Sequence, residues 1–158
     1  EVLEGGIHLM GFIAFVMLIA SGYATVIRAT GAVDQLVESA FNMLGGSKLA
    51  GSSIMILLGL LITMGIGTSF GTVPVIAAIY VPLSLKLGFS PAATVFMIAV
   101  AAALGDAGSP ASDTTLGPTA GLNADGQHDH IWDTCVPQFI CYDIPLMVVG
   151  IICPLFMN

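Results

Sequence analysis

Hydrophobic residues in this chain form long runs, and the polar residues between them are few. Gly5 to Ile27 is a nearly uncharged run as long as the ~20 residues with which a helix crosses a bilayer, and Arg28 closes it. The last run, Phe139 to Phe156, contains two prolines. Membrane helices tolerate proline because neighbouring helices satisfy the freed carbonyl groups. We therefore expect residues 1–30 and 139–158 to be the first and last membrane spans.

The segment from Gly31 to Leu44 has a different pattern. Its apolar residues recur at helical spacing, and its acidic and amide residues lie on the opposite side of the same helix. A helix with one apolar and one polar face lies along a membrane surface. We expect residues 31–48 to form such an amphipathic surface helix.

Two shorter apolar runs follow, Ala50 to Met64 and Val75 to Leu85. The longer one covers about 22 Å as a helix, which is short of a hydrocarbon core roughly 30 Å thick. The connector between them carries no charge, although a loop in solvent normally does. This pattern predicts a re-entrant hairpin over residues 49–87, with residues 67–72 as its buried tip.

A second interruption lies farther along the chain. The run from Pro91 to Leu104 begins with a proline suited to the first helical position and is broken by glycine and proline from Gly105 to Pro110. Thr114 to Leu122 would be the second half of this helix. We expect a discontinuous helix over residues 90–122 and a polar loop over residues 123–138. The predicted fold class is thus an all-α integral membrane protein.

Composition supports this class. Of the 158 residues, 56% are hydrophobic and 8% are charged, whereas a soluble domain has roughly 25% charged residues. We expect a multi-pass protein of the cell (inner) membrane with lipid as its surroundings. The formal net charge is −7 and only three residues are basic, which argues against nucleic acid as a partner. The three cysteines lack C-x-x-C spacing, so neither a zinc site nor a disulfide framework is indicated.

The two interruptions carry the candidate chemistry. Secondary transporters build ion sites from broken helices near the midplane of the bilayer, and sodium takes oxygen ligands. A carboxylate at that depth is costly unless it holds a cation or a proton, and competition between the two at one site would produce antiport. The candidate cation-binding residues are Thr68, Ser69, Thr72, Asp106, Ser109, Ser112, Asp113 and Thr114, with Asp106 and Asp113 as the proton-exchanging pair. We expect no cofactor, and no metal beyond sodium as the transported or coupling ion.

Other interpretations of these motifs stay open. Small and hydroxyl residues also occur where membrane helices pack closely, and either aspartate, Asp113 above all, would serve to cap the second half-helix. The G-x-S-x-G match at residues 67–71 is shared with serine hydrolases, which need a histidine base beside the serine. A metal site in the polar loop would use His128, Asp129, His130 and Asp133.

Residues 63–130 resemble the carboxyl-terminal part of the NhaC-like sodium/proton antiporter family, within the broader ion transporter superfamily. The GTSFGT segment at residues 67–72 and the GDAGSPASDTT segment at residues 105–115 carry the resemblance. It implies two inverted repeats, each with a surface helix, a re-entrant hairpin and a discontinuous helix, of which this chain holds the second. In the divalent-anion/sodium symporters of the superfamily the hairpin tip coordinates sodium, and Thr68, Ser69 and Thr72 align with its Ser-Asn-Thr motif.

The function implied is a sodium/proton antiport module and not an enzyme. The alternatives are a sodium-coupled symporter of an amino acid or organic acid, and an inactive half-transporter fragment. The partner expected for this half is the missing amino-terminal repeat or another chain that supplies it. We expect the intact protein to be a homodimer.

Overall fold

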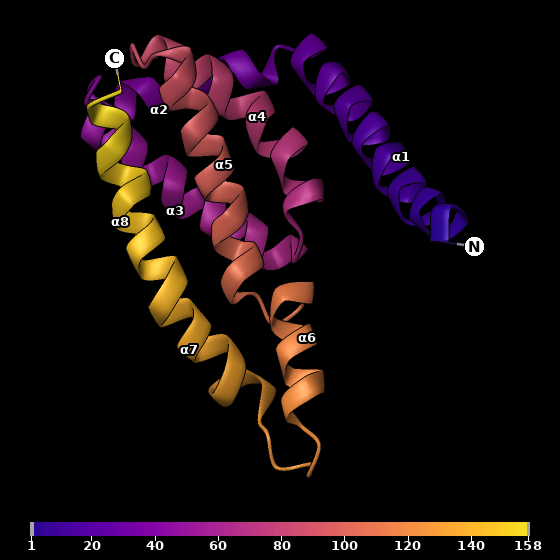
Figure 1. Ribbon diagram of the computed structural model, residues 1–158. Helices are drawn as coiled ribbons and strands as arrows, with labels where there is room; N and C mark the ends of the chain where they lie inside the picture. The colour runs from indigo at the N-terminus through magenta and orange to yellow at the C-terminus, as the bar shows by residue number, and fades with distance from the viewer. Residues whose placement is uncertain (1, 158) are drawn as a thin grey trace.

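The computed structural model describes residues 2–157, and in the first helix only part of the side chains. All regular elements in this described part are helical, with no strand (Figure 1). They are α1 (Val2–Ala29), α2 (Ala32–Leu44), α3 (Lys48–Ile66), α4 (Ser69–Lys86), α5 (Pro91–Gly108), α6 (Asp113–Leu122), η1 (His130–Cys135), α7 (Val136–Gln138), η2 (Phe139–Asp143), α8 (Ile144–Ile152) and η3 (Cys153–Leu155). Four helical segments in the described part are long and apolar enough to cross a membrane. The prediction of an all-α membrane protein is confirmed.

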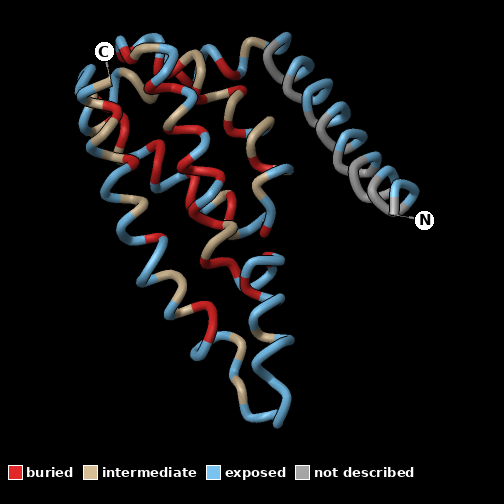
Figure 2. Tube along the Cα trace, in the orientation of Figure 1, coloured by how far each residue is buried: buried red, intermediate tan, exposed pale blue. Residues whose placement is uncertain are grey.

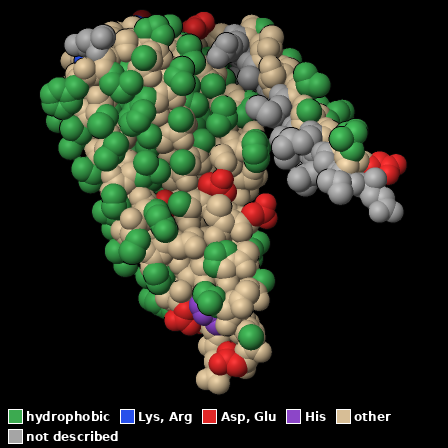
Figure 3. Space-filling model, viewed as in Figure 1, with side chains coloured by type: hydrophobic (Ala, Val, Ile, Leu, Met, Phe, Trp, Pro, Cys, Tyr) green, Lys and Arg blue, Asp and Glu red, His purple; other side chains and the backbone are tan. Residues whose placement is uncertain are grey.

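Helix α5 is at the centre of the bundle. It packs against α3, α4 and the last helical run from η2 to η3, and Figure 2 shows buried residues along most of its length. Met97 and Leu104 on α5 are fully buried, together with Met55 on α3 and Ile76 on α4. A helix that is apolar all round is expected to be buried in this way. On the face shown in Figure 3, hydrophobic side chains cover much of the upper part of the bundle, which suits contact with lipid.

Glycines let α3 and α5 approach until their backbones touch. A Cβ atom at Gly59 would lie closer than 3.0 Å to Ala101, and one at Gly105 would lie closer than 3.0 Å to the backbone of Thr63 and Met64. The Thr63 hydroxyl bridges the same crossing, 2.8 Å from the carbonyl oxygen of Gly59 and 2.9 Å from that of Ala101. Small residues and a shared hydroxyl are the usual means of close packing in membranes. This crossing holds the end of α5 against the end of α3.

Helix α2 has one buried side. Val33, Val37 and Leu44 are buried, whereas Glu38 on the opposite side is exposed and lies 3.8 Å from the Lys86 ammonium group. The structure therefore has an amphipathic helix where the pattern predicted one. Its position at a membrane surface stays a prediction.

The turn between α3 and α4 is only two residues long. Gly67 has a positive φ of 74° and donates its N–H to the Thr63 carbonyl at 2.7 Å, and the Thr68 hydroxyl accepts the N–H of Phe70. Helix continues through Gly65 and Ile66 on one side and from Ser69 on the other, so both arms are longer than the apolar runs alone predicted. Each arm has the length and composition of a complete span. Re-entry of this hairpin stays a prediction.

The last helical run begins at His130, inside the segment that we predicted as a polar loop over residues 123–138. The reason is a helix cap, because the Asp129 carboxylate accepts the N–H groups of Ile131 and Trp132, both at 2.9 Å. Two stretches of this run are π-helical, η1 and η2, and in η2 the N–H of Ile144 donates to the Phe139 carbonyl. Such wider turns change which side chains face the bundle.

Candidate cation site

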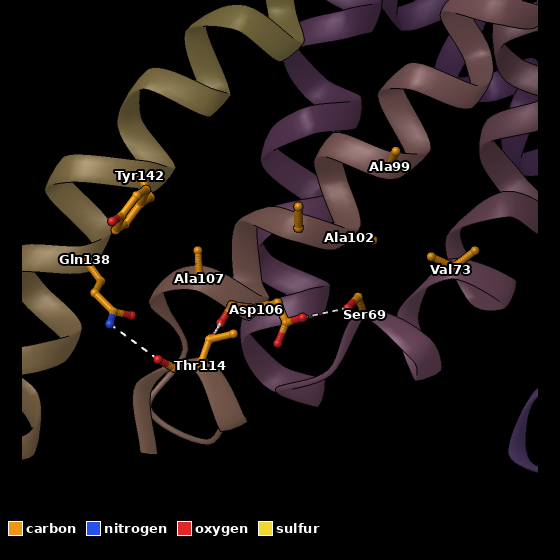
Figure 4. A pocket seen from close by; sticks show the side chains of 10 residues that line it. Ser69, Val73, Ala99, Ala102, Asp106, Ala107, Thr114, Gln138 and Tyr142 are labelled. Carbon is orange, nitrogen blue, oxygen red and sulfur yellow. Dashed lines mark hydrogen bonds between the residues drawn. The ribbon is translucent and has the colours of Figure 1, made fainter. Parts of the chain in front are cut away.

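The two interruptions meet in space. The Ser69 hydroxyl at the start of α4 donates to Asp106 Oδ2 near the end of α5 at 2.6 Å (Figure 4). The Ser109 hydroxyl donates to the Met64 carbonyl of α3 at 3.1 Å. Gly67 lies against Ala111, and a Cβ atom there would be 3.1 Å from the Ala111 carbonyl oxygen. The end of α3, the start of α4 and the break of α5 therefore form one polar cluster.

Hydroxyl groups satisfy the unwound backbone between α5 and α6. Pro110 cannot donate to the helical ladder, so carbonyl groups before it lose partners. Ser112 Oγ donates to the Asp106 carbonyl at 2.6 Å, Thr114 Oγ1 bonds to the same carbonyl, and Thr115 Oγ1 donates to the Ser109 carbonyl at 2.5 Å. Broken backbone at membrane depth needs such partners. A hydroxyl that donates its hydrogen also keeps acceptor lone pairs, which can bind a cation.

A cavity of about 590 Å³ opens beside this cluster. One end is polar, with Ser69, Asp106, Thr114 and Gln138, and Figure 4 shows Asp106 between Ser69 and Thr114. The remaining lining is mostly apolar, from Val73, Ala99, Ala102, Ala103, Ala107 and Tyr142. Asp106 is half-buried and is the one acidic residue of this lining. A carboxylate beside neutral oxygens and apolar walls binds either a cation or a proton.

The other predicted site residues lie around the cavity rather than in it. Ser109 and Ser112 are fully buried in the break. Thr72 is also buried, and its hydroxyl donates to the Thr68 carbonyl of its own helix at 2.9 Å. Asp113 is exposed in the first turn of α6 and is not among the lining residues. A carboxylate at that position interacts favourably with the amino end of the helix.

The geometry of Ser69 does not match a hydrolase. Its hydroxyl is bonded to the Asp106 carboxylate, whereas the rings of His128 and His130 are bonded to threonine hydroxyls, each at 2.7 Å. A serine nucleophile needs a histidine base within hydrogen-bonding reach. The two loop histidines are thus engaged away from the serine.

The loop residues that sequence offered as metal ligands have structural roles. Asp129 caps η1, and Asp133 accepts the N–H of Asp129 at 2.8 Å. His130 also bonds through Nε2 to the Pro110 carbonyl at 2.7 Å, which ties η1 to the break. Among the described residues, no group of three or more His, Cys, Asp or Glu side chains is placed to hold a metal ion.

One ionisable residue that the sequence analysis passed over lies close to this site. Asp143 at the end of η2 is fully buried, and a Cβ atom added at Gly108 would lie closer than 3.0 Å to its Oδ2 atom. The sequence did contain a signal for Asp143, namely its charge, because an acidic residue within an apolar span is a functional candidate by default.

Comparisons with known proteins agree with this description. The chain is 59% identical over 150 residues to "Putative amino acid transporter YuiF" of Bacillus subtilis, a match that covers 95% of this chain and 34% of the relative. It is 57% identical over 150 residues to an uncharacterized membrane protein of Vibrio parahaemolyticus, with 95% and 34% covered. A third relative, an uncharacterized membrane protein of Haemophilus influenzae, is 57% identical over 157 residues, with 99% and 35% covered.

The chain thus spans about a third of the length of the curated relatives it matches. No solved structure matches it. The family model described as "Na+/H+ antiporter family" matches residues 1–151, nearly the whole chain. From the helices, the broken α5 and this match we conclude that the chain belongs to the Na+/H+ antiporter family, whose members are membrane transporters and not enzymes.

Proposed function

We propose that this chain supplies the cation site of a sodium/proton antiporter, and that Asp106 binds sodium and a proton in turn. The observation that carries the proposal is the bond of 2.6 Å between the Ser69 hydroxyl and Asp106, which joins the two interruptions beside a cavity. Half-buried among apolar residues, an ionised and empty Asp106 carboxylate is unfavourable. This carboxylate is therefore placed to bind either sodium or a proton.

The exchange follows from this competition. Sodium would bind the ionised carboxylate together with neutral oxygens. The Ser69 hydroxyl is bonded to the carboxylate itself, and the Thr114 hydroxyl is bonded to the Asp106 carbonyl beside it. A proton that adds to a carboxylate oxygen removes the negative charge, and sodium then leaves. Because one carboxylate cannot hold both ions, each inward proton is coupled to an outward sodium ion, or the reverse.

We further propose an architecture for the intact protein. The chain would be the carboxyl-terminal repeat of an NhaC-like transporter, with α3 and α4 as a re-entrant hairpin whose tip is at residues 67–72. The support is the resemblance of residues 63–130 and the third of each relative's length that the chain spans. An amino-terminal repeat or a partner half would supply the rest of the site, in a homodimer of the cell inner membrane.

A second candidate is sodium-coupled symport of an amino acid. The printed name of the Bacillus subtilis relative, an amino acid transporter, favours it. The cavity of about 590 Å³ leaves room beside Asp106, but no Arg or Lys lines it to hold a substrate carboxylate. The basic group would have to come from outside this cavity.

The test is sodium-driven proton flux, measured with an enclosed pH dye in proteoliposomes that contain the intact protein. We expect flux without amino acids in the wild type and in Asp113→Asn, the matched control, because Asp113 is outside the cavity lining. Asp106→Asn should abolish flux, because an amide has nearly the same shape but does not exchange a proton near neutral pH. Unchanged flux in Asp106→Asn would contradict the antiport mechanism. Flux that requires an added amino acid would favour the symporter.

A further inference from the structure

Asp143 is a buried carboxyl group without a partner. Its side chain is 0% exposed, and neither carboxyl oxygen has a hydrogen-bond partner among the described residues. It is not part of the lining of the Asp106 cavity, although Tyr142 and Gln138 of the same helical run are. Buried polar groups are nearly always hydrogen-bonded, so such an orphan calls for a physical explanation.

The surroundings exclude an ionised group. The elements that pack against η2 are α5, α7 and α8, and the only ionisable side chain on these three is Asp106. On η2 itself, Cys141 and Tyr142 are exposed. None of these elements carries a lysine, arginine or histidine. An isolated charge in an apolar interior is far too costly, so a carboxyl group there is neutral or holds a cation.

The fold places this carboxyl group against the broken end of α5. Asp143 lies within a π-helical turn, which is closed by the hydrogen bond from the Ile144 N–H to the Phe139 carbonyl. Gly108, the last residue of α5, makes room, because a Cβ atom there would lie closer than 3.0 Å to Oδ2. The carboxyl end of a helix carries partial negative charge, which favours a proton or cation over a bare carboxylate.

We propose that Asp143 is a second proton-binding site, which is protonated in this conformation and exchanges its proton when the broken end of α5 moves. The step forms one O–H bond, as a proton from water adds to a carboxylate oxygen, and breaks the same bond when the proton returns to water. Protonation in this conformation rests only on the geometry of Asp143. Exchange during transport rests also on the proposed antiport function.

The first experiment tests protonation directly by infrared spectroscopy of the reconstituted intact protein at neutral pH and saturating sodium, where the proposed function has Asp106 hold sodium and contribute no neutral carboxyl band. We expect the carbonyl band of a neutral carboxyl group in the wild type, its loss in Asp143→Asn and its persistence in Asp106→Asn. Asp143→Asn keeps the side-chain shape and removes no hydrogen bond, so it should fold. A neutral carboxyl band that Asp143→Asn leaves unchanged, or no such band in the wild type, would overturn the proposal.

A glycine pair supplies a matched control. Gly108→Ala should displace the Asp143 carboxyl group and remove or shift the band, whereas Gly117→Ala on α6, with nothing within 4 Å of its added Cβ atom, should not. Equal spectra for the two variants would contradict the assigned contact.

A transport measurement then tests whether Asp143 exchanges its proton. We expect sodium-driven proton flux to be lost in Asp143→Asn, and wild-type flux in that variant would overturn the exchange step even if the band is present. If the wild type itself shows no sodium-driven proton flux, the antiport proposal fails together with this step, while the infrared result still decides whether Asp143 is protonated.

Discussion

Gly105→Ala tests whether the contact of α3 with α5 holds the site together. The added Cβ atom would lie closer than 3.0 Å to Met64 N and to the carbonyl carbon of Thr63, whereas relaxed carbon contacts are about 3.5–4.0 Å. The obstructing atoms belong to the helix backbone, which cannot rotate away as a flexible side chain can. The two helices must therefore separate by roughly 0.5 Å or more at this point.

The magnitude follows from known effects of overpacking. Such substitutions cost about 1–3 kcal/mol, and separation would also stretch the Thr63 bridge to Ala101, now 2.9 Å long. For a chain of this size, each kcal/mol corresponds to about 2–4 °C in melting temperature. We expect Gly105→Ala to melt several degrees below the wild type. We also expect it to lose sodium-driven proton flux, because Asp106, the proposed ion-binding residue, is the next residue in the chain and would be displaced with the helix.

The assay is thermal melting of the detergent-purified protein, followed by size-exclusion chromatography. Gly65→Ala is the matched control, because Gly65 also lies in a helix near this level and its added Cβ atom would meet nothing within 4 Å. Alanine there should be neutral or stabilise the helix by roughly 0.5–1 kcal/mol. The reasoning fails if Gly105→Ala melts at or above the wild-type temperature.

Three further predictions concern hydroxyl and carboxylate contacts. Ser69→Ala should weaken the apparent sodium affinity but keep transport at saturating sodium, because a ligand is one oxygen among several; complete loss of turnover at saturating sodium would contradict this role. Thr115→Val should lower the free energy of unfolding by about 0.5–1.5 kcal/mol in a chemical melt, because the Ser109 carbonyl loses the Thr115 hydroxyl and keeps only the N–H of Ser112, and an unchanged melt would refute that. Asp129→Ala should cost about 1 kcal/mol in the same melt, whereas Asp129→Asn, which can still cap η1, should cost less.

The break in α5 was predictable because its cause is local. Pro110 lacks an N–H, and the glycine and serine residues around it favour turns, so no tertiary contact is needed to end the helix. The arms of the hairpin were less predictable. Gly65 disfavours helix, yet it stays helical in α3, so the intrinsic propensity of this residue does not decide where the helix ends.

The positions of the carboxyl groups depend on the fold. Asp106 and Asp113 are both beside the break, and spacing alone does not reveal that only Asp106 reaches the cavity, because the break changes the helical phase between them. The burial of Asp143 results from π-helical turns and from the missing side chain of Gly108, which are tertiary features. Residue type identified these groups as candidates, but their surroundings had to come from the structure.

The hydroxyl bonds across the break have a mechanical consequence. The Asp106 carbonyl is bonded to the hydroxyls of Ser112 and Thr114 and not to a backbone N–H of the helix, so a change of the angle between α5 and α6 has only these two bonds to break at that carbonyl. Each such bond contributes only about 1 kcal/mol net. One elementary charge that crosses a membrane potential of about 100 mV releases about 2.3 kcal/mol, enough to break both bonds. The energy released by one ion that crosses the membrane is therefore large enough to bend the joint between the two half-helices.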